Sequence, residues 1–501
     1  MTSSIAPASI SSNNPVAYFC AEFGFDANLP IYAGGLGILA GDTLKQAADD
    51  AFPMIGVGLL YRGYGMKQVI NEHGDQHDED WLYDPLSQGL EHVYVDDMPL
   101  FIKVHMSEVD VWLRCWKKTF KNGVVLYLLD SETDQNQLTE RSITQVLYSG
   151  TQESLLKQQL ILGIGGVKLL TALGIHPSIF HLNEGRPAFL HWQLIRQFMD
   201  RHGVSYESAR ELAIERTVYT NHTLVAAGNQ GYDMELLKVL SRYYAEKMKI
   251  SVEELLRPGI DVDPKLFAIT RFALNVSRKA SGVSELHSRL SEEYWPQYHW
   301  TNVTNGVHMP TWRSALLTAD TIQNADALWN AHNQEKQNLA TFVQQQTGFG
   351  YDPSRMVITW SRRLAGYKQA HVLFEDLERL RQILKKKDQQ VQLLIAGKAH
   401  QGDSHGKNLL KDIIGYMQRE LSGNALFIPN YNLGIAERLV KGSDVWLNTP
   451  QLGKEACGTS GMKASANGVL QCSIPDGWMA EVTVDDYGWA LPPKDISLAL
   501  Y

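Results

Sequence analysis

The chain has 501 residues, of which 44% are hydrophobic and 20% are charged, and its formal net charge is −9. This length allows about two or three domains, and the mild acidity argues against a nucleic-acid or membrane-surface partner, which would need a basic footprint. No run approaches the ~20 apolar residues that a membrane-spanning helix needs.

The first residues, MTSSIAPASISSNNP, lack the charged and apolar segments of a secretory signal, so we expect a short disordered lead over residues 1–14. The four cysteines show no CxxC pairing. Neither a disulfide framework nor a metal site is therefore expected, and a reducing cytoplasm fits this cysteine usage best. Most aromatic residues are expected in the core, with a sugar-stacking cleft as the alternative.

Short apolar, β-branched runs alternate with longer helical patterns along the first part of the chain. The runs that we expect to form strands are 16–23, 52–61, 124–130, 179–184 and 216–223. A clear helical pattern between them covers residues 155–174. This alternation predicts parallel βαβ units and therefore an α/β fold.

A second series of strands is expected after a polar, Gln-rich segment at 332–355, which predicts a helix followed by a turn. These strands are expected at 356–364, 391–398, 425–430, 444–450 and 469–474. We therefore place a boundary near residue 350 and expect two Rossmann-like domains, at 15–350 and 351–501. Ligands of such sheets bind at the carboxyl ends of the strands, so residues that follow strands are the candidates for a site.

The segment AGGLGILAGD (33–42) formally matches the GxGxxG dinucleotide fingerprint. The match is incomplete, because the next expected strand ends in Tyr-Arg-Gly rather than near an acidic residue. Two interpretations stay open. The glycines form a tight structural turn, or their backbone N–H groups contact a phosphate near a helix N-terminus.

The segment SRRLAGYK (361–368) follows an expected strand and contains Arg362, Arg363 and Lys368. Guanidinium groups bind phosphate oxygens in a bidentate manner, and lysine adds a point charge. A solvated surface charge run is the alternative. The position at the carboxyl end of a strand favours an anion site.

Two polar segments, YTNHTL (219–224) and VTNGVH (303–308), place Asn and His side chains at expected strand ends or loops. Amides and imidazoles suit hydroxyl-rich ligands, and a structural role is the alternative for each. Glu455 is either a helix-terminus carboxylate or an acceptor for a sugar hydroxyl. GTSGMKAS lacks the spacing of a P-loop, and no Ser-His-Asp order or HExxH motif is readable, so nucleotide-triphosphatase, hydrolytic and metal mechanisms are disfavoured.

In chain order, these segments resemble the α-glucan (glycogen, starch and maltodextrin) phosphorylases, in particular the shorter bacterial-type branch. The resemblance runs from about residue 15 to residue 490, and it rests on YFCAEFGFDANLPIYAGGLGILAGD, LGIGGVKLLTALGIHPSIFHLNEGRPAF, YTNHT, TNGVHMPTW, SRRLAGYK, AGKAHQGD, DVWLNTPQLGKEACGTSGMKASANGVL and DGWMAEV. It implies the GT-B glycosyltransferase fold, in which a glucan-binding domain and a domain that binds pyridoxal 5′-phosphate (PLP) face each other across a cleft. It also implies reversible, retaining phosphorolysis of α-1,4-glucan or maltodextrin ends by inorganic phosphate, which yields α-D-glucose 1-phosphate.

The same resemblance assigns roles to residues. Lys463 would form a Schiff base with PLP, whose phosphate handles the proton, and Arg362, Arg363 and Lys368 would neutralise the two phosphate groups. The backbone carbonyl of His222 would face the developing oxocarbenium charge. The other matches are to cofactor contacts (Thr459, Ser460, Gly35 and Arg362) and to substrate contacts (Glu455, Asn305, Tyr367, His222, Gly34, Leu36 and Gly458).

Three features depart from the family pattern: Cys457 stands in place of a serine, Arg186 in place of a histidine, and DGWMAEV (476–482) in place of a double-Trp form. The chain ends at Tyr501, which is short for this branch and leaves its closing C-terminal helix unaccounted for. Two other functions stay open, a nucleotide-sugar-dependent GT-B glycosyltransferase and a catalytically silent glucan-binding protein on the same scaffold. Preferred glucan length, allosteric control and oligomeric state, a homo-oligomer included, are left open.

Overall fold

The computed structural model describes residues 8–148, 150–225, 229, 231–386, 390–494 and 496–500. The chain divides into two compact units, which we call the N-terminal unit (1–64, 81–283 and 288–303) and the C-terminal unit (65–80, 284–287 and 304–501). The predicted domains, 15–350 and 351–501, place this division later in the chain, and their functional assignment stays a prediction. Of the predicted disordered lead, residues 1–7 lie outside the described residues, and Ser11 pairs with Asn14 in a β-bridge.

The main sheet of the N-terminal unit has a parallel centre and an antiparallel edge. Its strands lie in the order β16-β15-β12-β11-β1-β2-β10-β9-β5, with β8 also paired to β9. Neighbours are parallel from β16 to β10, and β9 pairs antiparallel with β10, β8 and β5. The strands are β1 (Val16–Phe19), β2 (Met54–Leu59), β5 (Glu91–His92), β8 (Phe101–Met106), β9 (Val109–Thr119), β10 (Val125–Asp130), β11 (Ile179–Asn183), β12 (Thr217–Thr220), β15 (Lys279–Gly282) and β16 (Trp300–Asn302).

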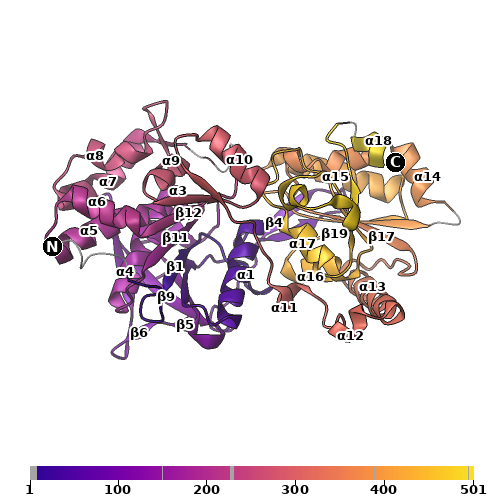
Figure 1. Cartoon of the computed structure of the whole chain (residues 1–501), viewed down its shortest axis with the longest axis horizontal. Helices are drawn as coiled ribbons and strands as arrows, with labels where there is room; N and C mark the ends of the chain where they lie inside the picture. Colours follow the sequence, from indigo (N-terminus) through magenta and orange to yellow (C-terminus); the bar gives the residue numbers. More distant parts are fainter. Residues whose placement is uncertain are drawn as a thin grey trace. The chain divides into compact units, whose positions relative to one another are not determined.

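This strand order confirms the predicted parallel α/β fold for the N-terminal unit. In chain order the parallel strands follow the doubly wound Rossmann pattern, which reverses direction between β1 and β11, and Figure 1 shows these two strands side by side. The long hairpin of β8 and β9 was not predicted. The sequence signal for this hairpin is an alternation along β9, in which every second residue in the middle of the strand becomes buried.

The main helices of this part of the chain are α1 (Gly35–Asp49), α3 (Gln152–Leu160), α4 (Gly166–Ala172), α5 (Leu190–His202), α6 (Tyr206–Glu215), α7 (Met234–Met248), α8 (Val252–Leu256), α9 (Ile269–Asn275) and α10 (Glu285–Tyr294). The predicted helix at 155–174 is confirmed, but it is interrupted by a π-helical turn at Ile161–Gly165 that lies between α3 and α4. The N-terminus of α3 is capped by the hydroxyl of Thr151, which accepts from the backbone N–H of Ser154.

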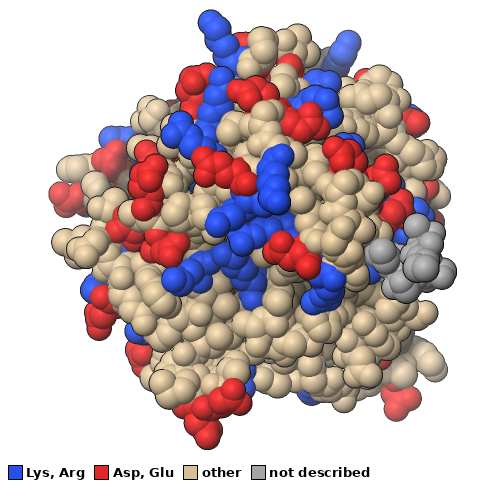
Figure 2. Space-filling model, turned by 90° about the vertical axis from the view of Figure 1, so that its left-hand side faces the viewer, with Lys and Arg blue, Asp and Glu red and all other residues tan. Residues whose placement is uncertain are grey.

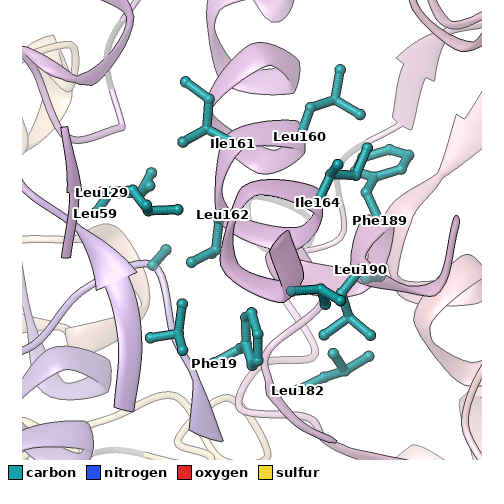
Figure 3. Close-up of a cluster of buried hydrophobic side chains, with 14 of the residues drawn as sticks. Phe19, Leu59, Leu129, Leu160, Ile161, Leu162, Ile164, Leu182, Phe189 and Leu190 are labelled. Carbon is teal, nitrogen blue, oxygen red and sulfur yellow. The ribbon is translucent and has the colours of Figure 1, made fainter. Parts of the chain in front are cut away.

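Apolar side chains on this interrupted helix pack against the sheet, as Figure 3 shows. Ile161, Leu162 and Ile164 lie within the π-helical turn and are fully buried together with Phe19 of β1 and Leu182 of β11. Burying a side chain of this size contributes roughly 1.5–3 kcal/mol. The cluster therefore holds the helix firmly against β1 and β11, the strands at which the sheet order reverses.

The C-terminal unit contains a fully parallel sheet in the order β19-β18-β17-β20-β21-β22. This is again the Rossmann order, and it reverses between β17 and β20. The strands are β17 (Met356–Ser361), β18 (Val391–Ala396), β19 (Ala425–Ile428), β20 (Val445–Asn448), β21 (Leu470–Ser473) and β22 (Gly488–Ala490). The strands predicted at 356–364, 391–398, 425–430, 444–450 and 469–474 are all confirmed. The hairpin of β3 (Lys67–Ile70) and β4 (Gln76–Glu79), which also belongs to this unit, was not predicted.

The helices of the C-terminal unit are α11 (Met309–Trp312), α12 (Ala319–Ile322), α13 (Ala325–Thr347), α14 (Leu377–Leu384), α15 (Ser404–Arg419), α16 (Leu433–Gly442), α17 (Thr459–Ser465) and α18 (Ile496–Leu500). The helix predicted within 332–355 is α13, which begins earlier than expected. Asp444, at the start of β20, accepts from Lys336 at 2.7 Å and from His332 at 2.8 Å, both on α13, and from the Val357 backbone N–H at 2.7 Å. These contacts fasten α13 to the sheet.

No helix within the described ranges is long and apolar enough to cross a membrane. Figure 2 shows one face of the molecule, on which Lys and Arg side chains gather near the middle, with Asp and Glu side chains around them. Charges of both signs are therefore mixed on this face.

Candidate active site

Two segments leave the C-terminal sheet where its strand order reverses. Residues 362–368 follow β17 and residues 449–458 follow β20, and these two strands are parallel neighbours. Parallel neighbours end at the same edge of a sheet, so the two segments meet there. Lys463 comes next, on α17. Sequence reasoning predicted a site at this kind of edge, and the residues it named from these segments do lie there.

Three largely buried charged side chains meet at this edge. The Glu455 carboxylate accepts from Arg362, with Nη2 and Oε2 2.6 Å apart, and from the Lys368 ammonium at the same oxygen. Burial acts to raise the pKa of Glu455, but the charges of Arg362 and Lys368 outweigh it and lower the pKa to about 2. Glu455 is therefore ionised at neutral pH, and the three side chains together carry one net positive charge.

One hydrogen-bond donor of this cluster is suited to an anion. The Nη1 atom of Arg362 is buried and has no hydrogen-bond acceptor among the described residues. A buried guanidinium N–H without an acceptor is costly, and a phosphate oxygen is the acceptor that best suits its geometry. A small pocket adjoins the cluster, and its lining includes Arg362, Asn448, Glu455, Cys457, Gly458 and Asp476.

Lys463 follows the lining residue Gly458 in the sequence and is a buried amine, with 6% of its surface exposed. Its Nζ lies 3.5 Å from the Thr459 hydroxyl and 4.1 Å from the ring centroid of Trp312. Helix α17 begins after Gly458, whose φ of 84° is left-handed and favours glycine. Ser460 accepts a hydrogen bond from the Trp446 indole at 3.3 Å. Thr459 and Ser460, predicted as cofactor contacts, thus lie on the first turn of the same helix as Lys463.

Arg363 and Tyr367 lie at the outer side of this arrangement. The Arg363 side chain is exposed, and its Nη2 donates to the Tyr367 hydroxyl at 3.5 Å. Burial acts to raise the pKa of Tyr367, but the charges of Lys368 and Arg363 outweigh it, and the pKa lies below its ordinary value. The structure therefore brings Arg362 and Lys368 onto Glu455, whereas Arg363 contacts the phenol.

Asn305, the predicted sugar contact on the loop after β16, lies beside the segment that carries Glu455. Its backbone N–H donates to the thiol of Cys457, and burial raises the pKa of this thiol to about 12. The thiol is therefore neutral and is engaged with the backbone. Cys457, which departs from the family pattern, thus keeps a hydrogen-bond acceptor at this position.

The N-terminal unit holds the remaining predicted residues at the carboxyl edge of its own sheet. His222 follows β12, and its Nε2 lies 2.5 Å from the side-chain oxygen of Asn183, at the end of β11. The backbone N–H of His222 donates to Glu184 at 2.5 Å. Burial raises the pKa of Glu184 to about 7. Neither Asn183 nor Glu184 was singled out from the sequence.

The glycine segment begins α1, with Gly34 as its N-cap and Gly35 and Leu36 in its first turn. Glu22, after β1, accepts from the backbone N–H groups of Ala33 at 2.6 Å and Gly34 at 3.2 Å. A Cβ added to Gly34 or Gly35 would meet no described atom within 4 Å. These contacts support a structural role for the turn, and the open space beside the two glycines is compatible with a phosphate contact, which stays a prediction.

Sequence reasoning also missed Trp312 and Asp476, which contact Lys463 and the backbone of Glu455 respectively. Both belong to segments that carried the family resemblance, TNGVHMPTW and DGWMAEV, yet neither residue type suggested a role by itself. Arg186 is another departure from the family pattern. Its guanidinium carbon lies 4.3 Å from the ring centroid of Tyr148 in the N-terminal unit.

Comparisons with known proteins show which proteins this chain is similar to. A family model described as carbohydrate phosphorylase matches residues 315–485. A maltodextrin phosphorylase of Thermococcus litoralis is 34% identical over 96% of this chain and 63% of its own length. A glycogen phosphorylase of Mycobacterium tuberculosis is 32% identical over 96% of this chain and 62% of its own. A glycogen phosphorylase of Aquifex aeolicus is 32% identical over 96% of this chain and 76% of its own length.

This chain thus spans 63% and 62% of the length of the first two of these relatives. With the Aquifex protein, the similarity covers nearly the whole chain and three quarters of the relative. Together with the matched family model, this similarity shows that the chain belongs to the carbohydrate phosphorylase family.

Proposed function

We propose that this protein is a PLP-dependent α-glucan phosphorylase, which transfers a glucosyl unit between the end of an α-1,4-glucan and inorganic phosphate. The products of phosphorolysis are a shortened glucan and α-D-glucose 1-phosphate, with retention at the anomeric carbon. The observation that carries the proposal is the buried Arg362–Lys368–Glu455 cluster, which has an unsatisfied guanidinium N–H and lies at the sheet edge from which α17 and Lys463 follow. The names of the relatives support the same chemistry.

The residues present fit the PLP cofactor. Lys463 is a buried amine, and the segment before it, CGTSG, has small side chains that leave room for a flat ring. The unpaired Nη1 of Arg362 is suited to a phosphate oxygen. Thr459 and Ser460 add hydroxyl groups on the same helix. When bound, the cofactor supplies a phosphate group that exchanges a proton with substrate phosphate.

The protein side chains supply charge and orientation. Arg362 and Lys368 offset the charge of phosphate groups brought close together, and Arg363, which is exposed here, adds a third cation for substrate phosphate. Preorganised charges of this kind stabilise a transition state without further reorganisation. Glu455 is ionised and accepts a hydrogen bond from a sugar hydroxyl, and Asn305 contributes an amide to the same sugar.

The proposal also assigns roles by the family resemblance. The backbone carbonyl of His222 would face the positive charge that develops on the sugar ring, and Tyr367 would contact the sugar. Gly34, Gly35, Leu36 and Gly458 contact phosphate or sugar through their backbones. The proposal includes the GT-B arrangement, with residues 15–350 as the glucan-binding and 351–501 as the PLP-binding domain. It also includes a reducing cytoplasmic setting, which the four free cysteines support.

A direct experiment tests this function. The purified protein is incubated with maltodextrin and inorganic phosphate, and the release of glucose 1-phosphate is measured, with Lys463→Ala as the control. We expect release that depends on both phosphate and Lys463. A protein that binds maltodextrin without phosphorolysis would instead be a glucan-binding protein, and activity that requires a nucleotide sugar would make it a glycosyltransferase of a different kind.

A further inference from the structure

The DGWMAEV segment follows β21 and forms a tight turn in the C-terminal unit. Asp476 precedes a short 3₁₀-helix at Gly477–Glu481, and 3% of the Asp476 surface is exposed. One oxygen of its carboxylate accepts from the Gly477 backbone N–H at 2.8 Å. Its other oxygen accepts from two backbone N–H groups of another segment, those of Gly453 at 2.9 Å and Glu455 at 3.1 Å. Asp476 therefore fixes the backbone from which the Glu455 side chain projects.

A second contact from the same turn fastens the segment next to Glu455. The backbone N–H of Trp478 donates to the carbonyl of Cys457 at 2.9 Å. The approach is close, because a Cβ added at Gly477 would lie 2.2 Å from the Cys457 oxygen, and the φ of Gly477 is 59°. Any side chain at Gly477 would separate the two backbones. The turn and the 453–457 segment are thus packed backbone to backbone.

The far end of the turn contacts the residue that precedes Asn305, the other proposed sugar contact. The Glu481 carboxylate accepts from the Thr304 hydroxyl at 2.9 and 3.0 Å and from the Glu285 backbone N–H at 2.8 Å. Thr304 is the residue before Asn305, whose backbone N–H donates to the Cys457 thiol. One turn of six residues therefore holds both Glu455 and the segment of Asn305 through two carboxylates.

We propose that residues 476–481 form a positioning element for the sugar site, in which Asp476 sets the orientation of Glu455 and Glu481 sets that of Asn305. The inference rests on the proposed function, in which these two side chains hold the transferred glucosyl group. Asp476 and Glu481 act on the sugar indirectly in this proposal. Each acts through the backbone or the neighbouring residue of a side chain that does.

Asp476→Asn is the informative substitution, because it leaves the side-chain volume almost unchanged. It replaces one carboxylate oxygen by an NH₂ group, which cannot accept a hydrogen bond from the backbone N–H groups that face it. We expect kcat/KM for maltodextrin phosphorolysis to fall on the order of 10- to 100-fold, the range in which small misplacements near a reacting group act. Asp476→Glu should recover part of the loss, since it restores a carboxylate. Hydrogen exchange of the backbone amides in a peptide covering 452–458 should accelerate in Asp476→Asn.

Asp444→Asn is the matched control. Asp444 is also a largely buried carboxylate that accepts from a backbone N–H, but it fastens α13 at the opposite end of β20. This control should lower stability and leave kcat/KM within about twofold of the wild type, because independent sites do not couple. Equal losses in both variants would mean that any buried carboxylate of this unit has the same effect, and would overturn the positioning role.

A double-variant cycle then tests whether Asp476 acts through Glu455. In a Glu455→Gln background, Asp476→Asn should change kcat/KM by less than about twofold, whereas independent effects would multiply. A full 10- to 100-fold further loss in that background would refute the proposal. Should Asp476→Asn fail to fold, Glu481→Gln decides in its place: kinetics like those of the wild type would refute the positioning role.

These experiments distinguish a failure of the proposed function from a failure of the positioning role. If the wild type releases no glucose 1-phosphate, that function is wrong, and hydrogen exchange in the 452–458 peptide still tests the backbone contact. Exchange unchanged by Asp476→Asn would refute that contact. Wild-type phosphorolysis combined with normal kinetics in Asp476→Asn would refute the positioning role alone.

Discussion

Glu455→Gln removes the carboxylate that Arg362 and Lys368 share. The pKa of Glu455 is about 2 in the folded chain against an ordinary value of 4.5, and this difference corresponds to about 3 kcal/mol. The Glu455 side chain is 12% exposed, so solvent screens the pair little. Removing one partner of a buried ion pair typically costs about 3–5 kcal/mol, which agrees in magnitude. We therefore expect the free energy of unfolding to fall by about 3 kcal/mol at neutral pH.

The pH dependence has a definite sign. Because the pKa of Glu455 is lower in the folded than in the unfolded chain, its contribution to stability is fully present above about pH 4.5 and is lost as the pH falls towards 2. The difference in unfolding free energy between the wild type and Glu455→Gln should therefore be constant from pH 7 to about pH 5. It should shrink between about pH 4.5 and pH 2.

Denaturant unfolding of both proteins across this pH range measures the difference. Glu79→Gln is the control, because Glu79 pairs with Lys67 at 3.1 Å in the same unit but its side chain is 54% exposed. Exposed pairs contribute less than about 1 kcal/mol, so this control should change stability little. A loss below about 1 kcal/mol in Glu455→Gln at pH 7, or a difference that does not shrink in acid, would refute the account of the buried cluster.

Three further outcomes are expected. Purified protein should carry about one PLP per chain, and borohydride should fix it to the peptide that contains Lys463. Lys463→Ala should lose phosphorolysis while keeping its circular dichroism spectrum. Label on another lysine would contradict the assignment. Arg363→Ala should raise the KM for phosphate and for glucose 1-phosphate about 10- to 100-fold. This change is equivalent to about 1.5–3 kcal/mol, the contribution of a charge-assisted contact. Normal phosphate kinetics in this variant would remove Arg363 from the site. Asp444→Asn should lower the free energy of unfolding by about 3 kcal/mol, because the Lys336 ammonium loses its ionised partner and Lys336 is only 4% exposed. Thermal denaturation like that of the wild type would contradict the role of Asp444 in holding α13.

The parallel α/β architecture could be predicted from the sequence because its signals are local. A buried parallel strand is a short run of apolar, β-branched residues, and runs such as 356–364 and 391–398 carry that signal within themselves. The candidate cations could be found for the same reason, since Arg362 and Lys368 follow a strand, and the carboxyl end of a strand is where α/β sheets bind ligands. Antiparallel hairpins such as β8–β9 were missed, because alternating polar residues make their pattern weaker.

Pairings between distant segments depended on tertiary structure. Nothing in the order of residues says that Glu455 meets Arg362 and Lys368 rather than Arg363, because the strand order, which places β17 beside β20, decides which segments share an edge. The same holds for Asp476 and Glu481. Most of their partners are backbone N–H groups, which every residue except proline has, so the sequence alone does not show which of them is used. Local pattern determines which elements form, whereas long-range packing determines which side chains can exchange charge and hydrogen bonds.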